Sequence, residues 1–222
     1  MITVPPPESG NDRVLSLIDR LVEPADQGLR TLFRVHQSTR SYPADGIDDT
    51  VDQPATRRKV ISLMRINHSG EVAAQALYQG QALVARNPVL RESLLEAGRE
   101  EADHLAWCSQ RIGELGGRTS LFDPLWYAGS FAIGALAGLA GDRTSLGFVA
   151  ETERQVVEHL EGHLAELPHD DRRTREIVNQ MSADEARHGH NAMQAGGAAL
   201  PPLTRALMKL TAGVMTRTAR WI

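Results

Sequence analysis

The feature that most constrains this fold is a Glu-x-x-His motif that occurs twice in segments of helical periodicity. "EADH" places Glu101 three residues before His104, and "EARH" places Glu185 three residues before His188. Residues three apart on a helix share one face, so each motif can present a carboxylate and an imidazole to one ion. From 15 glutamates and 8 histidines, composition alone predicts about half a match. Each motif therefore predicts half of a metal site.

The rest of the chain predicts an all-α protein, because no segment alternates convincingly at the period of a strand. Asn87-Pro88 begins one helix, Gly116-Gly117 ends it, and Pro201-Pro202 separates the last two. A third match to the motif, Glu166 to His169, contains a proline where a helix should end, so its side chains need not share a face. The predicted helices span residues 56–86, 88–115, 124–141, 145–166, 171–199 and 202–221.

Residues 1–55 are predicted to form an extension, and residues 56–222 the main domain. Asn11 and Asp12 can cap a short amphipathic helix whose apolar residues run from 14 to 22. The later stretch "QSTRSYPADGIDDTVDQP" clusters Pro, Gly, Asp and Ser without apolar periodicity, which is typical of a loop. The sequence leaves the role of this extension open.

Two lone glutamates complete a repeated layout. Glu71 precedes Glu101 by 30 residues, and Glu153 precedes Glu185 by 32. In ferritin-like carboxylate proteins, two Glu-x-x-His helices and a Glu from each of two other helices hold a pair of metal ions. The layout therefore predicts a ferritin-like four-helix bundle, to which two apolar or amphipathic helices are added.

Helical spacing favours Glu153 over its neighbour Glu151. The positions on the same helical face as Glu153 are apolar, so its carboxylate is predicted to point into the core. The positions around Glu151 are mostly polar, which predicts a solvated face. The same comparison favours Glu101 over Glu100.

Four core carboxylates require cations to balance their charge, because an isolated buried charge is costly. Oxygen-rich sites with two imidazoles suit iron or manganese better than a metal that prefers thiolate, and iron is the first choice. His68 is expected to be a core histidine or a partner of a ligand rather than a ligand itself. His159 and His163 share one helical face. They either contact the ligands or line a substrate channel, or this face is solvated. Asp103 and Asp184 either orient a ligating imidazole or are surface charges.

Four segments resemble the metal-binding segments of the demethoxyubiquinone hydroxylases, the di-iron monooxygenases of ubiquinone biosynthesis. They are "RINHSGEVAAQALYQGQ", "EEADHLAWC", "FVAETERQVVEHL" and "DEARHGHNA", within a similarity that covers about residues 57–222. The resemblance implies two iron ions per chain, and catalysis that acts through them. The six implied ligands are Glu71, Glu101, His104, Glu153, Glu185 and His188.

The resemblance also implies the reaction. Dioxygen is reduced and cleaved, and one oxygen atom enters the ring of demethoxyubiquinol while the other becomes water. The family is expected to accept electrons from NADH. The chain carries no dinucleotide fingerprint, because its nearest run, "GALAGLAG" at residues 134–141, lacks the G-x-G-x-x-G spacing and follows no predicted strand.

Residues 124–141 carry no charge, and their number makes them a transmembrane candidate. A single crossing would separate the two halves of the predicted metal site, so the segment is not expected to span alone. Interfacial insertion is favoured, helped by the basic C-terminal helix at residues 202–221. The alternative is close helix packing through the small residues Ser130, Gly134 and Gly138.

Charge and composition limit the classes of partner that the chain can be expected to bind. A formal net charge of -4 without a long Lys/Arg run argues against nucleic acid. Cys108, the single cysteine, allows no intrachain disulfide, and residues 1–10 lack a secretory signal. We expect a peripheral membrane protein, at the cytoplasmic face of the cell membrane if the source is bacterial, with a polyprenyl quinol and O2 as substrates. Other ubiquinone-biosynthesis proteins and a second copy of the chain are further candidate partners.

Two other classes of function compete with this prediction. A ferritin-like iron-storage protein would use the same six ligands, but an exposed apolar segment would be a liability on a cage-forming exterior. A non-catalytic lipid-binding helical protein leaves the buried carboxylates unexplained. Oxygen uptake that depends on added quinol is expected of the hydroxylase alone.

Overall fold

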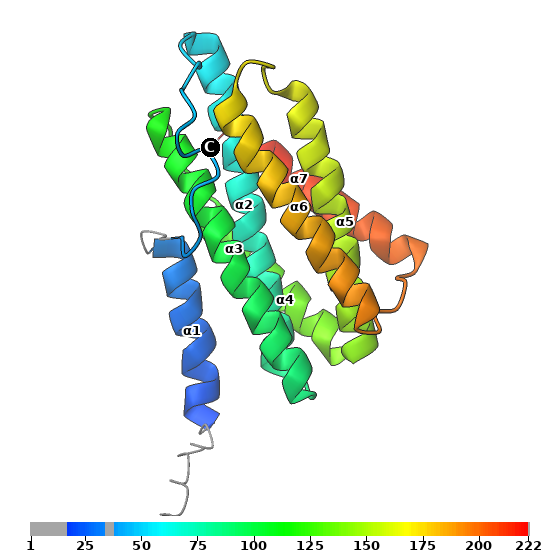
Figure 1. Cartoon of the computed structure of the whole chain (residues 1–222). Helices are drawn as coiled ribbons and strands as arrows, with labels where there is room; N and C mark the ends of the chain where they lie inside the picture. The colour runs from blue at the N-terminus through cyan, green and yellow to red at the C-terminus, as the bar shows by residue number, and fades with distance from the viewer. Residues whose placement is uncertain (1–16, 34–37, 222) are drawn as a thin grey trace, which may run out of the picture.

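The structure, a computed structural model, describes residues 17–33 and 38–221, which form seven helices and no strand. The helices are α1 (Leu17–Phe33), α2 (Pro54–Val84), α3 (Pro88–Glu114), α4 (Asp123–Leu139), α5 (Asp142–Glu166), α6 (Arg172–Gln194) and α7 (Pro202–Ala219). In Figure 1, α2, α3, α5 and α6 run side by side along one direction, with α2 paired to α3 and α5 paired to α6. The all-α class and the ferritin-like bundle are confirmed.

Local sequence explains most of the helix ends. Proline occupies the first turn of α2 and of α3, where a backbone N–H would have no partner within the helix. The side chain of Asn87 caps α3 by accepting hydrogen bonds from the backbone N–H groups of Val89 and Leu90. Asp171 caps α6 in the same way, through the N–H of Thr174 at 3.0 Å. The bundle helices are therefore positioned by their own termini as well as by packing.

The predicted boundaries differ from the observed ones by up to five residues. α6 ends at Gln194 rather than at residue 199, because Gly196 adopts a φ of 100° that ends the helix. α5 begins three residues earlier than predicted, directly after Gly141, whose φ is 107°. The predicted start of the N-terminal helix lies outside the described residues, and α1 continues to Phe33.

The main hydrophobic core includes side chains from the segment before α2. Tyr42, Ala44 and Val51 are buried in the same cluster as Trp107 and Ile177. Full burial of a valine-sized side chain stabilises a fold by about 1.5–3 kcal/mol, so this segment is held firmly against the bundle. The division of the chain at residue 55 stays a prediction.

α4 packs closely on α2 through its small residues. A Cβ atom on Gly134 would collide with the backbone carbonyl of Leu77, and one on Gly80 with the carbonyl of Phe131. The small residues of α4 therefore serve close helix packing, which is the alternative that the sequence left open for this segment. The other face of α4 exposes Leu125 and Leu136 at 60% and 67%. Within the described residues, no helix is both long enough and apolar enough to cross a bilayer.

Candidate metal centre

The four bundle helices turn all six predicted ligands toward the bundle interior. Each of the six is buried, with an exposed fraction between 0% and 7%. They comprise Glu71 from α2, Glu101 and His104 from α3, Glu153 from α5, and Glu185 and His188 from α6.

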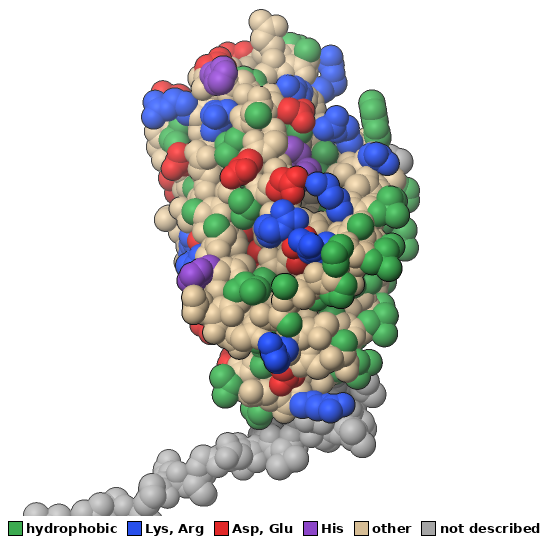
Figure 2. Space-filling view, turned by 90° about the vertical axis from the view of Figure 1, so that its right-hand side faces the viewer, with side chains coloured by type: hydrophobic (Ala, Val, Ile, Leu, Met, Phe, Trp, Pro, Cys, Tyr) green, Lys and Arg blue, Asp and Glu red, His purple; other side chains and the backbone are tan. Residues whose placement is uncertain are grey.

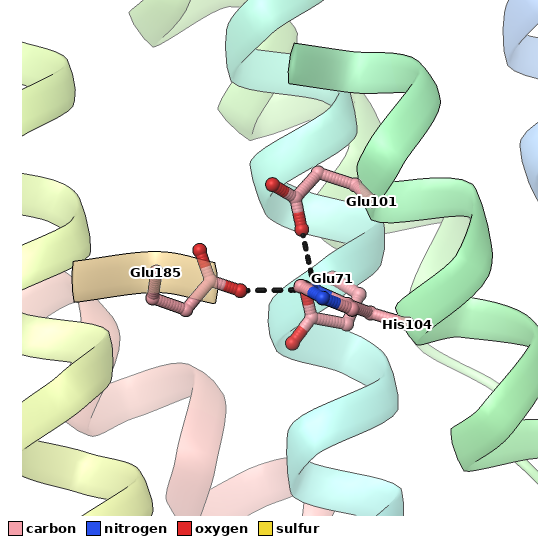
Figure 3. Close-up of side chains that lie close together, drawn as sticks. All are labelled: Glu71, Glu101, His104 and Glu185. Carbon is pink, nitrogen blue, oxygen red and sulfur yellow. Dashed lines mark hydrogen bonds and ion pairs between the residues drawn. The ribbon is translucent and has the colours of Figure 1, made fainter. Parts of the chain in front are cut away.

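The ligand atoms form two adjoining groups. Those of Glu71, Glu101, His104 and Glu185 lie within 4.8 Å of one another. Figure 3 shows these four side chains close together. The ligand atoms of Glu153, Glu185 and His188 form a second group within the same limit. Glu185 belongs to both groups and so lies between two candidate ion sites. The structure thus brings the six residues together in the paired arrangement that the sequence predicts.

Several of these atoms come close to one another without making a hydrogen bond. Nδ1 of His104 is 3.0 Å from Oε1 of Glu185, and Nδ1 of His188 is 3.4 Å from Oε2 of the same carboxylate. Both oxygens of Glu185 and Nδ1 of His188 nevertheless lack a hydrogen-bond partner, as do one oxygen of Glu101 and one of Glu153. Buried polar atoms without partners are costly. Divalent cations between them would satisfy these atoms, so the residues present fit a two-metal centre.

Burial and mutual repulsion would set the protonation of these groups when no cation balances them. Burial raises the pKa of Glu71 well above its usual value, and the charges of Glu185 and Glu101 raise it further. Burial likewise raises the pKa of Glu153. Burial lowers the pKa of His188, but its contacts with Glu101 and Glu185 outweigh this effect and raise it to about 11. Metal binding would therefore displace protons from the cluster.

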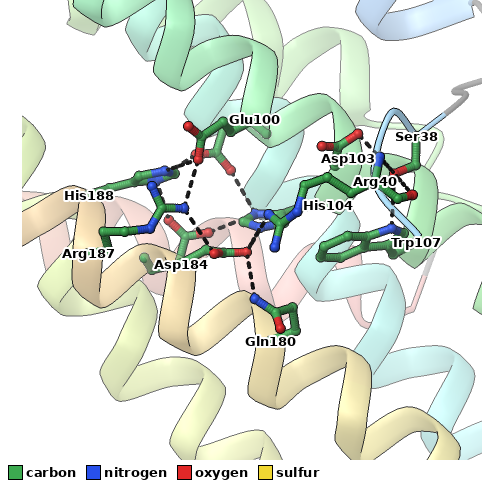
Figure 4. A network of polar contacts seen from close by, with 12 residues as sticks. Ser38, Arg40, Glu100, Asp103, His104, Trp107, Gln180, Asp184, Arg187 and His188 are labelled. Atoms are coloured by element: carbon green, nitrogen blue, oxygen red, sulfur yellow. Dashed lines mark hydrogen bonds and ion pairs between the residues drawn. The ribbon is translucent and has the colours of Figure 1, made fainter. Parts of the chain in front are cut away.

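The Nε2 nitrogen of each imidazole meets a carboxylate from the opposite motif, as Figure 4 shows. His104 lies 3.2 Å from Asp184, and His188 lies 2.9 Å from Glu100. An N–H donated to a carboxylate keeps the proton on Nε2 and leaves Nδ1 available for a metal. Arg187 joins the two carboxylates, donating to Glu100 at 2.8 Å and to Asp184 at 3.0 Å.

These contacts resolve some of the sequence alternatives. Asp184 orients an imidazole. Asp103 accepts hydrogen bonds from Ser38 and Thr39, and among the described residues its hydrogen bonds include none to His104 or His188. His68 is a buried histidine outside both ligand groups, as expected, with Nδ1 3.2 Å from Asp123.

Two residues that contact candidate ligands escape the sequence reasoning. Glu100 lies off the apolar face of its helix. Membership of that face is the wrong criterion for a residue whose partner, His188, comes from a second helix. The hydroxyl of Tyr78 donates a hydrogen bond to Glu153. Its position seven residues after Glu71 was the available signal, because that spacing places both on one face of α2.

Glu153 and Glu151 occupy different environments, but the prediction for Glu151 is wrong in part. Glu153 joins a ligand group, and Glu151 does not. Glu151 is nevertheless only 8% exposed, and it accepts hydrogen bonds from Arg154 and Gln155 at 2.8 Å each. The helical spacing of α5 could not reveal this burial, because α7 packs against that side of the helix.

His159 and His163 form a pair on α5 outside both ligand groups. Their rings pack edge to face with centroids 4.0 Å apart, and His163 is 3% exposed. Burial lowers the pKa of both residues, that of His163 to about 3. The solvated face that the sequence left open is therefore excluded for His163.

Comparisons with known proteins agree with this geometry. The sequence model of a family described as "Ubiquinone biosynthesis protein COQ7" matches residues 58–219. The 3-demethoxyubiquinol 3-hydroxylase of Ralstonia pickettii is 54% identical over 214 residues, which cover 91% of this chain and 99% of the relative. Proteins with the same name from Cupriavidus taiwanensis and Nitrosococcus oceani are 55% and 54% identical, covering 91% and 95% of this chain and 99% of each relative. The chain therefore belongs to the COQ7 family of ubiquinone biosynthesis proteins.

Proposed function

We propose that this chain is a di-iron monooxygenase that hydroxylates the ring of 3-demethoxyubiquinol with O2. The observation that carries the proposal is the pair of buried ligand groups that share Glu185. Support also comes from relatives about half identical over nearly their whole length, which are named for this reaction.

The six buried ligands would hold two iron ions per chain. Four carboxylates and two neutral imidazoles balance the charge of two ferrous ions, and this donor set suits iron. Bound iron supplies the electron transfer to O2 that no protein side chain performs. The chain's own residues fix the ligands, because Asp184 and Glu100 hold the two imidazoles by Nε2.

The reaction balances with an external reductant. One O2, two electrons and two protons yield the ring hydroxyl group and one water molecule. NADH is the proposed source of the electrons. Its site would differ from a Rossmann fold, because "GALAGLAG" lies on and directly after α4, and no strand precedes it within the residues described.

We propose that the enzyme works at a membrane surface, the cytoplasmic face of the cell membrane, because the polyprenyl tail of the proposed substrate is insoluble in water. α7 exposes Leu203, Leu207 and Leu210 at 72%, 55% and 64%. α4 adds the exposed side chains of Leu125 and Leu136. Figure 2 shows hydrophobic side chains gathered along the right-hand edge of the molecule, with Lys and Arg side chains nearby. Apolar side chains beside basic ones favour interfacial docking on anionic lipid.

The quinone that accumulates in cells without this protein tests the proposal. We expect demethoxyubiquinone to accumulate, and the wild-type gene to restore ubiquinone. Glu153→Ala should fail to restore it, because it removes a candidate ligand. Glu151→Ala is the matched control on the same helix and should restore it. Unchanged ubiquinone in cells without the protein, or rescue by Glu153→Ala, would contradict the proposal.

A further inference from the structure

Residues 38–40 lie against α3 at Asp103, a residue of its Glu-x-x-His motif. The Ser38 hydroxyl donates to Asp103 at 2.9 Å, and the backbone N–H of Thr39 donates to the same oxygen at 2.7 Å. Asp103 is 3% exposed and lies in sequence between Glu101 and His104. The segment is thus anchored at the level of the candidate metal centre.

Arg40 reaches from this anchor to α6, as Figure 4 shows. Its guanidinium donates to Oδ2 of Asp184 at 2.7 Å and lies over the ring of Trp107, 4.9 Å from the centroid. The same Oδ2 atom is the one that meets Nε2 of His104 at 3.2 Å. Trp107 is itself held by a hydrogen bond from Nε1 to Ser38. A charged side chain from outside the bundle therefore joins Arg187 and Gln180 of α6 in holding the Asp184 carboxylate, which contacts the imidazole of His104.

The far end of the segment is secured independently. Arg111, which is fully buried, pairs with both oxygens of Asp49 at 2.9 and 3.0 Å. Arg173 donates to the backbone carbonyls of Ala44 and Ile47 at 3.0 and 2.6 Å. The segment therefore keeps its course over the bundle without depending on Arg40.

From these contacts we propose that residues 38–52, here called the N-terminal strap, complete the metal centre, and that Arg40 is a positioning residue for His104. The strap joins the two motif-bearing helices at the level of the ligands. Arg40 fixes Asp184 by charge and geometry, and Asp184 fixes the imidazole so that Nδ1 faces the ligand group. The working domain then begins near residue 38, ahead of the family match at residues 58–219. This inference rests on the metal centre of the proposed function but not on its substrate.

Anaerobic titration of the full chain with ferrous ion tests the role of Arg40. Arg40→Met keeps the packing on Trp107 and removes the charge, whereas Arg40→Lys keeps the charge. We expect Arg40→Met to weaken binding of one of the two ferrous ions about 10-fold and to change the ferrous magnetic circular dichroism spectrum. Arg40→Lys should recover part of both effects.

Arg173→Gln is the matched control, because the hydrogen bonds that it removes from the strap lie toward its far end, on Ala44 and Ile47, and the contact of Arg40 with Asp184 stays in place. It should lower the melting temperature and leave ferrous binding and the spectrum unchanged below that temperature. In an Asp184→Asn background, Arg40→Met should have little further effect on ferrous affinity, because Arg40 acts through that carboxylate.

Wild-type ferrous affinity and spectrum in Arg40→Met would overturn the inference and leave the strap a structural cover. An equal, additive loss in the Asp184→Asn background would overturn the route through Asp184. A wild-type protein that binds two ferrous ions but does not hydroxylate the quinol would contradict the proposed substrate alone, because these readouts do not use it.

Discussion

The carboxylate of Glu100 lies 2.9 Å from Nε2 of His188, on the helix that carries the other Glu-x-x-His motif. Asp184 stands in the equivalent relation to His104. In both motifs, the residue directly before the motif glutamate braces the imidazole of the opposite helix. The two halves of the centre therefore orient each other.

Glu100→Gln should weaken ferrous binding about 10- to 100-fold, the usual effect of losing a partner of a ligating imidazole. A carboxylate only accepts a hydrogen bond, whereas an amide can also donate one to an unprotonated Nε2. The tautomer of His188 with its proton on Nδ1 is then more populated, and fewer molecules offer Nδ1 to the metal. Anaerobic titration with ferrous ion measures the change. Glu92→Gln is the control, because Glu92 is an exposed residue of α3 paired with Arg99. Equal affinities in the two variants would show that Glu100 does not act on the centre.

Replacing Glu71 and Glu153 by Gln should stabilise the metal-free protein, and more at about pH 8 than at about pH 5. Burial raises the pKa of both carboxyls above the ordinary 4.5. The folded state then binds more protons than the unfolded state, so wild-type stability falls as pH rises above that value. Thermal melts at the two pH values measure the difference. Ferrous ion should raise the melting temperature of the wild type and not that of the variant. If the variant and the wild type differed in stability by the same amount at both pH values, this explanation would be wrong.

The buried pair on α5 should make stability depend on pH in the opposite direction. Burial lowers the pKa of His163 from 6.5 to about 3, with His159 and Arg220 adding to the effect. The unfolded state therefore binds more protons, so the contribution is complete above about pH 6.5 and is lost as pH falls toward 3. Between about pH 7.5 and pH 5 the loss should be about 2 kcal/mol.

Urea unfolding at both pH values would measure this loss. His163→Leu should flatten the pH dependence in this window, whereas His190→Leu, a substitution at an exposed histidine, should not. The same slope in wild type and His163→Leu would assign the dependence to other groups.

Leu203→Glu with Leu207→Glu on α7 should release the protein from anionic liposomes. Both side chains are exposed, so the fold should tolerate the change. Turnover of a long-tailed quinol should fall several-fold, while turnover of a short-tailed analogue and iron content stay close to wild type. Co-sedimentation with liposomes and the two activities are the measurements. Met193→Glu is the control, with a residue 48% exposed on α6. Equal release by both variants would indicate that general charge rather than this face governs binding.

The motifs and their repeated layout predicted the candidate ligands, and helical spacing predicted which face of the helix is buried at Glu101 and Glu153. Glu153 is the clearest case, since its neighbours on α5 are apolar. The same reasoning failed for the burial of Glu151, because α7 lies beside it. It favoured Glu101 over Glu100 in agreement with the ligand groups, but it gave no sign that Glu100 meets His188 of α6. A helical pattern reports which face is apolar, and it does not report which polar residue another helix covers.

The contacts of the strap could not be predicted for a related reason. Arg40 and Asp184 are 144 residues apart, and the segment around Arg40 has the Pro, Gly and Asp content of a loop. Composition predicts that such a stretch is irregular, but its course depends on the tertiary partners Asp103, Arg111 and Arg173.

The most direct test of the central claim is the fate of labelled dioxygen. The iron-loaded protein, reduced anaerobically and supplied with demethoxyubiquinol, is exposed to ¹⁸O₂, and the quinol product is analysed by mass spectrometry. We predict one ¹⁸O atom in the new ring hydroxyl group, in the wild type and in Glu151→Ala, and no product from Glu153→Ala. An unlabelled hydroxyl group, or oxygen consumption by iron without hydroxylated quinol, would contradict the assignment of this centre to a quinol monooxygenase.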